Sequence, residues 1–327
     1  MSPHARPVLS TALVLLVLSL AGAGSATAAT KRQPRVVPGS TYLALGDSVT
    51  FGYLEPSVVP APDYSRASNF LGFPEHLAAR MRLEVTNAAC PGETTASFLD
   101  ASAQSYGCRN TVPGNAGGFY RPHSPLHTSY SSSQMAYAVR FLRRHRETRL
   151  VSLMIGGNDF FVCQETAPNH CTTPQEQEAT FSTIRDNVRT ILSAIRRKGR
   201  YRGQIAIVHY HSLDYSSPAL NAISVGLNRA MSDGAKPFRV RVADGYGELE
   251  AATRLFGGRT CQGGLVTTLG PSQTCGVHPT YAGQAMLAQA LEKAIRLRSS
   301  TRASASGDLG PPPPASATAT AGARSRP

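Results

Sequence analysis

Five short apolar segments alternate with segments of helical periodicity along this 327-residue chain, and this alternation restricts the fold more than any other feature. The apolar segments end in turn-forming residues and predict strands at residues 42–45, 83–88, 150–155, 204–210 and 238–243. The intervening segments predict helices at 73–81, 133–146, 174–197, 219–233 and 280–298, with a short helix opening at 93. Strands joined through helices run parallel and are covered on both faces. We therefore predict an α/β fold with a five-stranded parallel sheet, in a single domain over residues 41–298.

The two ends of the chain depart from this pattern. An apolar run over residues 8–21 follows a short basic start, and Ala26-Thr27-Ala28 matches the small-x-small pattern of a cleavage site. The run is short for a membrane span, so residues 1–28 predict a secretory signal peptide rather than an uncleaved anchor, and we expect an extracellular protein. Residues 29–40 are interpreted as a leader. Residues 299–327, rich in Pro, Ala, Ser and Thr, predict a disordered tail.

The chain is strongly basic, with a formal net charge of +13. Such a charge can attract nucleic acids or anionic lipids. The cations are nevertheless spread along the chain, except between Arg140 and Arg146, where their spacing predicts a solvated helix face. The chain also contains no tryptophan and no nucleic-acid-binding motif. We expect a monomer with no nucleic-acid partner and no integral membrane segment.

Six cysteines in an exported chain predict three disulfides. Fifteen pairings are possible for six cysteines. The local spacing favours the pairs Cys90–Cys108, Cys163–Cys171 and Cys261–Cys275. No Cys-x-x-Cys pair occurs, and His209 and His211 lack a nearby third ligand, so we expect no metal site.

Residues suited to acyl transfer follow three of the predicted strands. Ser48 follows the first strand, Gly92 the second and Asn158 the third. Because the carboxyl ends of parallel strands lie at one edge of a sheet, these residues can converge. Ser48 can act as a nucleophile, and its N–H, the Gly92 N–H and the Asn158 amide can stabilise an oxyanion. His278, before the last helix, can act as the base. Asp47 and Asp159 lie beside these residues, and we interpret them as structural.

These residues stand in four sequence blocks that together resemble the GDSL, or SGNH, hydrolases. The blocks are Gly46-Asp47-Ser48-Val49, the turn at Gly92, Gly156-Gly157-Asn158-Asp159 and His278-Pro279. The resemblance covers residues 41–298. The sequence around Cys90 is also similar to that of secreted bacterial members with several disulfides. It implies a three-layer, flavodoxin-like α/β/α fold and hydrolysis of carboxylic esters without a metal or cofactor. It also implies that Ser48 is the nucleophile and His278 the base, with Gly92 and Asn158 completing the oxyanion hole.

One departure from the family pattern concerns the group that orients the histidine. The family usually has an aspartate three residues before the histidine, and that position is Cys275 here. A backbone carbonyl can accept the Nδ1–H hydrogen bond of an imidazole in place of a carboxylate. We therefore predict a Ser48–His278 dyad supported by the Cys275 carbonyl. Asp244, at the end of the fifth strand, is the alternative partner and would complete a variant triad.

The substrate class is less strongly indicated than the reaction. The segment 101–132 has no apolar periodicity, and so long a connection is often a lid or a wall of a site. An acyl pocket or the ordinary core can accommodate the aromatic residues near the blocks, which are Phe51, Tyr53, Phe119, Phe160 and Phe161. The main prediction is a secreted esterase or lipase acting on small-molecule or lipid esters. The alternatives are a carbohydrate O-acetyl esterase, a phospholipase and a non-catalytic binding protein.

Overall fold

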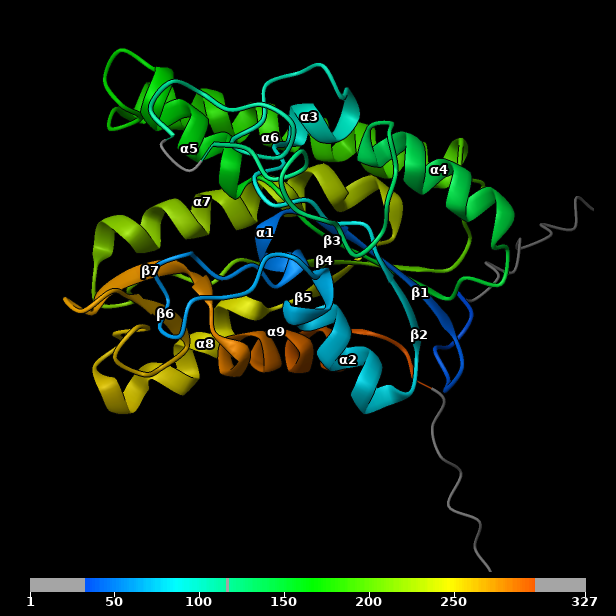
Figure 1. The fold of residues 1–327 in the computed structure, drawn as a ribbon. Coiled ribbons are helices and arrows are strands. Elements are labelled where there is room, and N and C mark those ends of the chain that lie inside the picture. Colours follow the sequence, from blue (N-terminus) through cyan, green and yellow to red (C-terminus); the bar gives the residue numbers. More distant parts are fainter. Residues whose placement is uncertain (1–32, 116–117, 298–327) are drawn as a thin grey trace, which may run out of the picture. The chain divides into compact units, whose positions relative to one another are not determined.

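A five-stranded parallel sheet in the order β2-β1-β3-β4-β5 forms the centre of the computed structural model, which describes residues 33–115 and 118–297 (Figure 1). The strands are β1 (Thr41–Gly46), β2 (Glu84–Asn87), β3 (Leu150–Met154), β4 (Gln204–Val208) and β5 (Arg241–Ala243). All neighbouring pairs are parallel, and this order is the doubly wound arrangement of flavodoxin-like folds. The predicted fold class and single domain are confirmed. The predicted signal peptide and tail lie outside the described residues.

The central strands are buried on both faces, which explains their uninterrupted apolar sequences. Every residue of β3 and β4 is buried, and in β1 all residues after Thr41 are buried. A strand in the middle of a parallel sheet is covered by helices on both sides, so it cannot alternate apolar and polar side chains. Only the ends of the predicted strands differ. Strand β5 is the shortest, because Arg239 has a left-handed backbone and precedes it.

Helices form a layer on each face of the sheet (Figure 1). One layer contains α3, α4, α6 and α7, which contact one another, and the other contains α2, α8 and α9. The helices are α1 (Ser48–Phe51), α2 (Phe73–Met81), α3 (Thr95–Leu99), α4 (Gln134–Arg144), α5 (Gly157–Thr166), α6 (Pro174–Arg197), α7 (Pro218–Ala235), α8 (Gly245–Thr253) and α9 (Tyr281–Ala294). Three 3₁₀ turns are η1 (Ala67–Asn69), η2 (Lys236–Phe238) and η3 (Arg254–Phe256).

Two segments for which the sequence predicted neither a helix nor a strand contain regular structure. The segment after β3 forms α5, which begins directly after Gly156. The segment after β5 forms α8 and then an antiparallel pair of strands, β6 (Val266–Leu269) and β7 (Thr274–Pro279). These elements are short and mostly half-buried, so they carry little periodicity that a sequence pattern can reveal. His278 consequently lies on a strand rather than in a loop.

The six cysteines are joined in the pairs that their spacing favours: Cys90–Cys108, Cys163–Cys171 and Cys261–Cys275. Within the predicted leader, Val36 is buried and forms a parallel bridge with Leu297. The fold therefore begins several residues before β1. Within the described residues, no helix is both long enough and apolar enough to cross a membrane.

A buried glutamine at the start of α4 connects the first strand to the helix layer that contains α4. Gln134 accepts a hydrogen bond from the Gly46 N–H at 2.7 Å and donates to the Gly46 carbonyl at 2.9 Å. Its amide also donates to the Glu93 carboxyl at 3.0 Å. Gly46 has φ +149°, and a Cβ there would lie 2.2 Å from the Met154 carbonyl oxygen. The last residue of β1 is therefore held by a glycine and by a side chain from α4.

We expect Gln134→Ala to lower the free energy of unfolding by about 2–4 kcal/mol, because several buried polar groups would lose their partner. Urea denaturation followed by circular dichroism measures this loss. Arg140→Ala, on the exposed side of the same helix, serves as the control and should cost less than about 0.5 kcal/mol. Equal small losses in both variants would show that the Gln134 contacts do not stabilise the sheet.

Candidate active site

Ser48 lies at the turn between β1 and α1. Strand β1 ends at Gly46, and Ser48 is the first residue of α1. Asp47 caps this helix by accepting a hydrogen bond from the Val49 N–H at 3.0 Å. Gly52 ends the helix with φ +84°, where a Cβ would lie 2.3 Å from the Gly72 nitrogen. Both ends of the short helix are thus fixed, and its first residue is held in one position.

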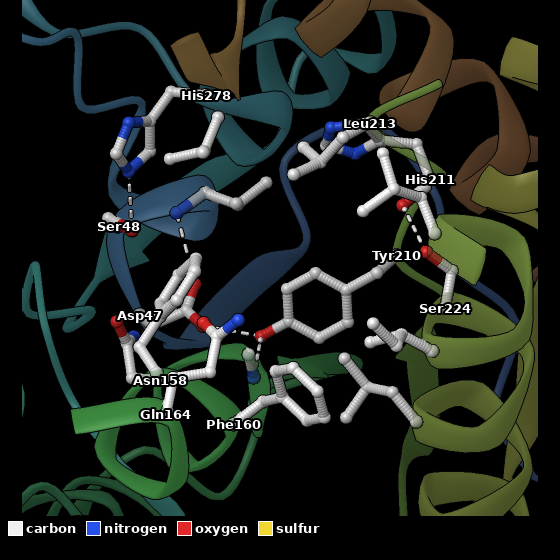
Figure 2. A pocket seen from close by; sticks show the side chains of 17 residues that line it. Asp47, Ser48, Asn158, Phe160, Gln164, Tyr210, His211, Leu213, Ser224 and His278 are labelled. Carbon is white, nitrogen blue, oxygen red and sulfur yellow. Dashed lines mark hydrogen bonds between the residues drawn. The ribbon is translucent and has the colours of Figure 1, made fainter. Parts of the chain in front are cut away.

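His278 contacts the Ser48 hydroxyl. Its Nε2 lies 2.9 Å from Ser48 Oγ, which is hydrogen-bonding distance. The ring of Tyr53 contacts the imidazole in an edge arrangement, with ring centroids 4.9 Å apart. Figure 2 shows the imidazole directly beside Ser48. This contact joins residues 230 positions apart in the sequence.

A carboxylate that the sequence analysis did not identify lies on the other side of this imidazole. Glu55 Oε1 is 2.9 Å from His278 Nδ1, an ion-pair contact in which the ring N–H is not aligned well enough for a hydrogen bond. The same oxygen accepts hydrogen bonds from the Val277 N–H at 2.8 Å and the His278 N–H at 3.2 Å. Thr267 donates to the other oxygen at 2.8 Å. Burial alone would raise the pKa of Glu55, but the charge on His278 and these hydrogen bonds lower it to about 2.

The predicted partners of His278 are therefore wrong. Asp244 caps α8 by accepting a hydrogen bond from the Gly247 N–H at 3.0 Å, so its carboxylate serves a helix end instead. Cys275 is exposed and pairs with Thr268 in the β6–β7 ladder. Glu55 follows Ser48 closely in sequence but stands in a proline-rich loop without a motif. Only the packing of that loop against β7 reveals its contact with His278.

Three potential oxyanion donors line one pocket together with His278: the N–H groups of Ser48 and Gly92 and the side chain of Asn158. Neither N–H donates a hydrogen bond to another residue in the described ranges. The Asn158 amide donates to the Glu93 carbonyl at 3.0 Å, which leaves its second N–H unused. Gly92 has φ +78°, and a Cβ there would lie 2.6 Å from the backbone of Gly107, so this turn requires glycine.

The two aspartates of the sequence blocks, Asp47 and Asp159, accept hydrogen bonds that fix the segments around the site. Asp159 accepts a hydrogen bond from the Thr95 N–H at 2.8 Å and thereby fixes the segment that follows Gly92. Asp47 accepts a hydrogen bond from the Tyr210 hydroxyl. Burial raises the pKa of each aspartate to about 6, although hydrogen bonds to each carboxylate oppose the shift. These contacts are the ones expected of structural residues.

A small apolar cavity of about 140 Å³ lies beside Ser48, between α5 and α7 (Figure 2). Its walls include Phe160, Phe161, Leu220 and Ile223. His211 is also in the wall; its ring is buried, and neither ring nitrogen has a hydrogen-bond partner among the described residues. Burial, together with the charge of His278, lowers the pKa of His211 to about 4, so the ring is neutral at neutral pH.

A second, wider pocket of about 600 Å³ is also lined by Ser48 and His278. Tyr53, Tyr64, Tyr106, Phe119, Tyr120 and His123 contribute to its walls. Most of these residues come from the segment 101–132, which therefore forms a wall of the site. The aromatic residues named from the sequence line one of the two pockets, except Phe51. Phe51 is fully buried against Phe70 and belongs to the core.

The described residues contain one group of three potential metal ligands, Cys90, Glu93 and Cys108. Both cysteines are in a disulfide and cannot act as thiolate ligands. Of the two histidines considered earlier, His209 donates to or accepts from Ser232 Oγ at 2.8 Å, whereas His211 lines the small cavity.

Solved structures with a similar fold include several hydrolases. An acetylxylan esterase from Geobacillus stearothermophilus is 16% identical, with a TM-score of 0.47, and the match covers 81% of this chain and 100% of that one. A phospholipase A1 from Streptomyces albidoflavus is 18% identical with a TM-score of 0.49, covering 79% and 100%. A lipase from a goat rumen metagenome is 15% identical with a TM-score of 0.49, covering 80% and 99%. At these values the likenesses carry no argument about substrate.

No curated protein sequence matches the chain. The model of the GDSL-like lipase/acylhydrolase family matches residues 44–286, a range that includes Ser48, Gly92, Asn158 and His278. This range is most of the chain and nearly all of the described fold. The protein therefore belongs to the GDSL-like lipase/acylhydrolase family.

Proposed function

We propose that this protein is a secreted serine hydrolase that cleaves carboxylic esters through an acyl-enzyme. The observation that carries the proposal is the line of contacts from Ser48 Oγ to His278 Nε2 and from His278 Nδ1 to Glu55, each 2.9 Å long. A nucleophile, a base and a group that orients the base constitute a catalytic triad. A non-catalytic binding protein would be supported by the lack of the family's aspartate, but Glu55 provides a carboxylate that contacts His278.

In the proposed reaction, Ser48 Oγ attacks the ester carbonyl carbon while His278 Nε2 takes its proton. The carbonyl oxygen becomes an oxyanion, which accepts hydrogen bonds from the N–H groups of Ser48 and Gly92 and from the Asn158 amide. The bond to the alcohol then breaks, and His278 returns the proton to the departing oxygen. Water attacks the acyl-Ser48 ester by the same route and releases the acid. Throughout, the Glu55 carboxylate stabilises the imidazolium that forms at His278.

The two pockets support a short acyl group and a larger alcohol. A cavity of about 150 Å³ holds one benzene molecule, so the small cavity beside Ser48 has room for an acyl group of about six non-hydrogen atoms. The wide pocket can hold the alcohol, and its tyrosine hydroxyls and histidine suit a polyhydroxyl group. This arrangement favours a carbohydrate ester over a long-chain lipid ester as the substrate.

Secretion and a monomeric state are also part of this proposal. Three disulfides are typical of an exported protein, and residues 1–28 have the pattern of a signal peptide. All the proposed catalytic groups come from a single chain, so the site needs no second subunit.

Ser48→Ala should abolish ester hydrolysis without unfolding the protein, because the proposed intermediate needs the Ser48 Oγ atom. Release of nitrophenol from nitrophenyl butanoate measures activity, and circular dichroism checks the fold. Turnover near the wild-type rate in the purified variant would exclude Ser48 as the nucleophile.

Glu55→Gln should lower kcat by about 10²–10⁴, because an amide can accept the two backbone N–H groups but cannot stabilise an imidazolium. Asp244→Asn is the matched control, since it also removes one carboxylate, and it should cost less than about tenfold. A large loss in Asp244→Asn with a small one in Glu55→Gln would reverse the assignment.

Glu55 should also affect how stability depends on pH. Its pKa in the folded protein, about 2, is below the ordinary value of 4.5, so the ionised form stabilises the fold. This contribution is complete above pH 4.5 and is lost as the pH falls towards 2. The difference in unfolding free energy between the wild type and Glu55→Gln should therefore shrink over that range, as urea denaturation can measure.

The acyl assignment predicts a preference for short chains. The cavity has room for an acyl chain of about six carbons. Esters with acyl chains of about four to six carbons should therefore be hydrolysed faster than dodecanoate esters. Leu220→Ala enlarges the cavity and should move the optimum to longer chains, whereas Phe119→Leu in the wide pocket should not. An unchanged optimum in Leu220→Ala would place the acyl group elsewhere.

A further inference from the structure

The positive charge of the protein is concentrated at the edge of the sheet opposite to Ser48. This edge holds the starts of the strands and the ends of α4, α6 and α9. The segments 82–84, 143–149, 196–204, 239–241 and 294–297 contain thirteen Arg or Lys residues but only two carboxylates, Glu84 and Glu147. Most of these cations are exposed. They are scattered in the sequence, and the topology brings them to one edge because each crossover returns the chain there.

Part of this edge is a concave surface, which we call the basic groove. Its main hollow, of about 780 Å³, is lined by Arg189, Arg196, Arg197, Lys198, Arg202 and Arg239. A neighbouring hollow of about 320 Å³ shares Arg239 and adds Arg241 and Arg296. No Asp or Glu lines either hollow. The groove is therefore a continuous positive surface formed by α6, η2 and the segments before β4 and β5.

The exposed cations of the groove have no carboxylate partners. The ion pairs of the described residues involve other cations, namely Arg80, His145, Arg185, Arg229, Lys236, His278 and Lys293. Arg196 differs from its neighbours, because it donates hydrogen bonds to the carbonyls of Gly203 at 2.8 Å and Phe238 at 3.2 Å. These bonds connect α6 to the segment before β4 and to η2. Arg241 likewise donates to the Ala294 carbonyl at 3.0 Å. The guanidinium groups of Arg197, Arg202 and Arg239 have no hydrogen-bond or ion-pair partner among the described residues and can bind an external ligand.

Helix electrostatics explain only part of this cluster. Cations at the end of a helix interact favourably with its dipole, which accounts for Arg197 and Lys198 at the end of α6. Arg202, Arg239 and Arg296 are not in the last turn of a helix. Burial and the charges of Arg202 and Arg239 together lower the pKa of Arg196, which shows that the cations repel one another. A bound anion would relieve this repulsion.

We propose that the basic groove binds an extended, single-chain polyanion. A concave surface fits a polymer chain, whereas a flat bilayer would contact the groove only at its rim. Seven of the eight cations that line the two hollows are arginines, whose planar groups bind phosphate or carboxylate through paired hydrogen bonds. Ser48 and Gly92 follow the carboxyl ends of β1 and β2, which are the opposite ends of the strands. A polymer bound in the groove therefore does not cover the proposed active site, which lies at the opposite edge of the sheet.

The test compares two charge-reversal variants with the same net charge. The first carries Arg197→Glu, Lys198→Glu and Arg202→Glu in the groove. The matched control carries Arg66→Glu, Arg254→Glu and Arg259→Glu, which are exposed and lie outside it. Binding to fluorescent polyphosphate and polygalacturonate is measured by anisotropy over a range of salt concentrations, and circular dichroism checks both folds.

At physiological salt, we expect the groove variant to bind at least one of these polymers about a hundredfold more weakly than the wild type. Each cation near an anionic surface contributes about 1 kcal/mol, and the variant loses three of them. The control should lose less than about fivefold, because separated surface charges are screened. Equal losses in the two variants would show that net charge alone attracts the polymers. No binding by the wild type would also overturn the proposal.

Two rival partners are tested with the same variants. Vesicles containing phosphatidylglycerol represent an anionic membrane, and a short DNA duplex represents a nucleic acid. Groove-dependent binding to either rival that is tighter than to both polymers, at equal charge concentration, would overturn the assignment to a single-chain polyanion. Ester hydrolysis is not a readout of these experiments, so their result does not depend on the proposed reaction.

Discussion

The contact between Glu55 and β7 holds the site together. One carboxylate accepts the backbone N–H groups of Val277 and His278 and also contacts the imidazole, so it fixes both the strand and the ring. Because Glu55 lies in the loop that follows α1, this contact also ties β7 to the segment carrying Ser48. The low pKa of Glu55 follows from the same geometry, since every one of these groups favours the charged carboxylate. A half-buried carboxylate therefore contacts the imidazole at a position where the family pattern would supply an aspartate.

The other side of the site depends on buried polar groups of a different kind. Glu93 is fully buried, and burial raises its pKa to about 7 despite hydrogen bonds from Ser97 and Gln134. Its carbonyl accepts the Asn158 amide, and Gln134 links it to the end of β1. The turn at Gly92 and the helix that carries Asn158 are therefore positioned by one connected network. A network whose members are nearly all satisfied is rigid, which suits donors that must be in place before charge develops.

The two edges of the sheet have different chemistry, and both follow from the topology. The carboxyl ends of β1 and β3 carry the residues of the site, whereas the strand starts and the segments before them carry a cluster of twelve arginines. In a doubly wound fold these edges are separated by the length of the strands. A protein of this fold can therefore combine a proposed catalytic site with an independent binding surface, without competition between their ligands.

The sequence by itself determined the five parallel strands and the helices between them, the family and the candidate residues Ser48, Gly92, Asn158 and His278. Each depends on a local signal, such as an apolar run or a short block before a turn. The tertiary structure decided which carboxylate contacts His278, because Glu55 has no motif and reaches the imidazole only when its loop packs against β7. It also decided that the scattered arginines form a groove and that a small cavity lies beside Ser48. Such features depend on distances between segments far apart in the chain, which periodicity and spacing do not encode.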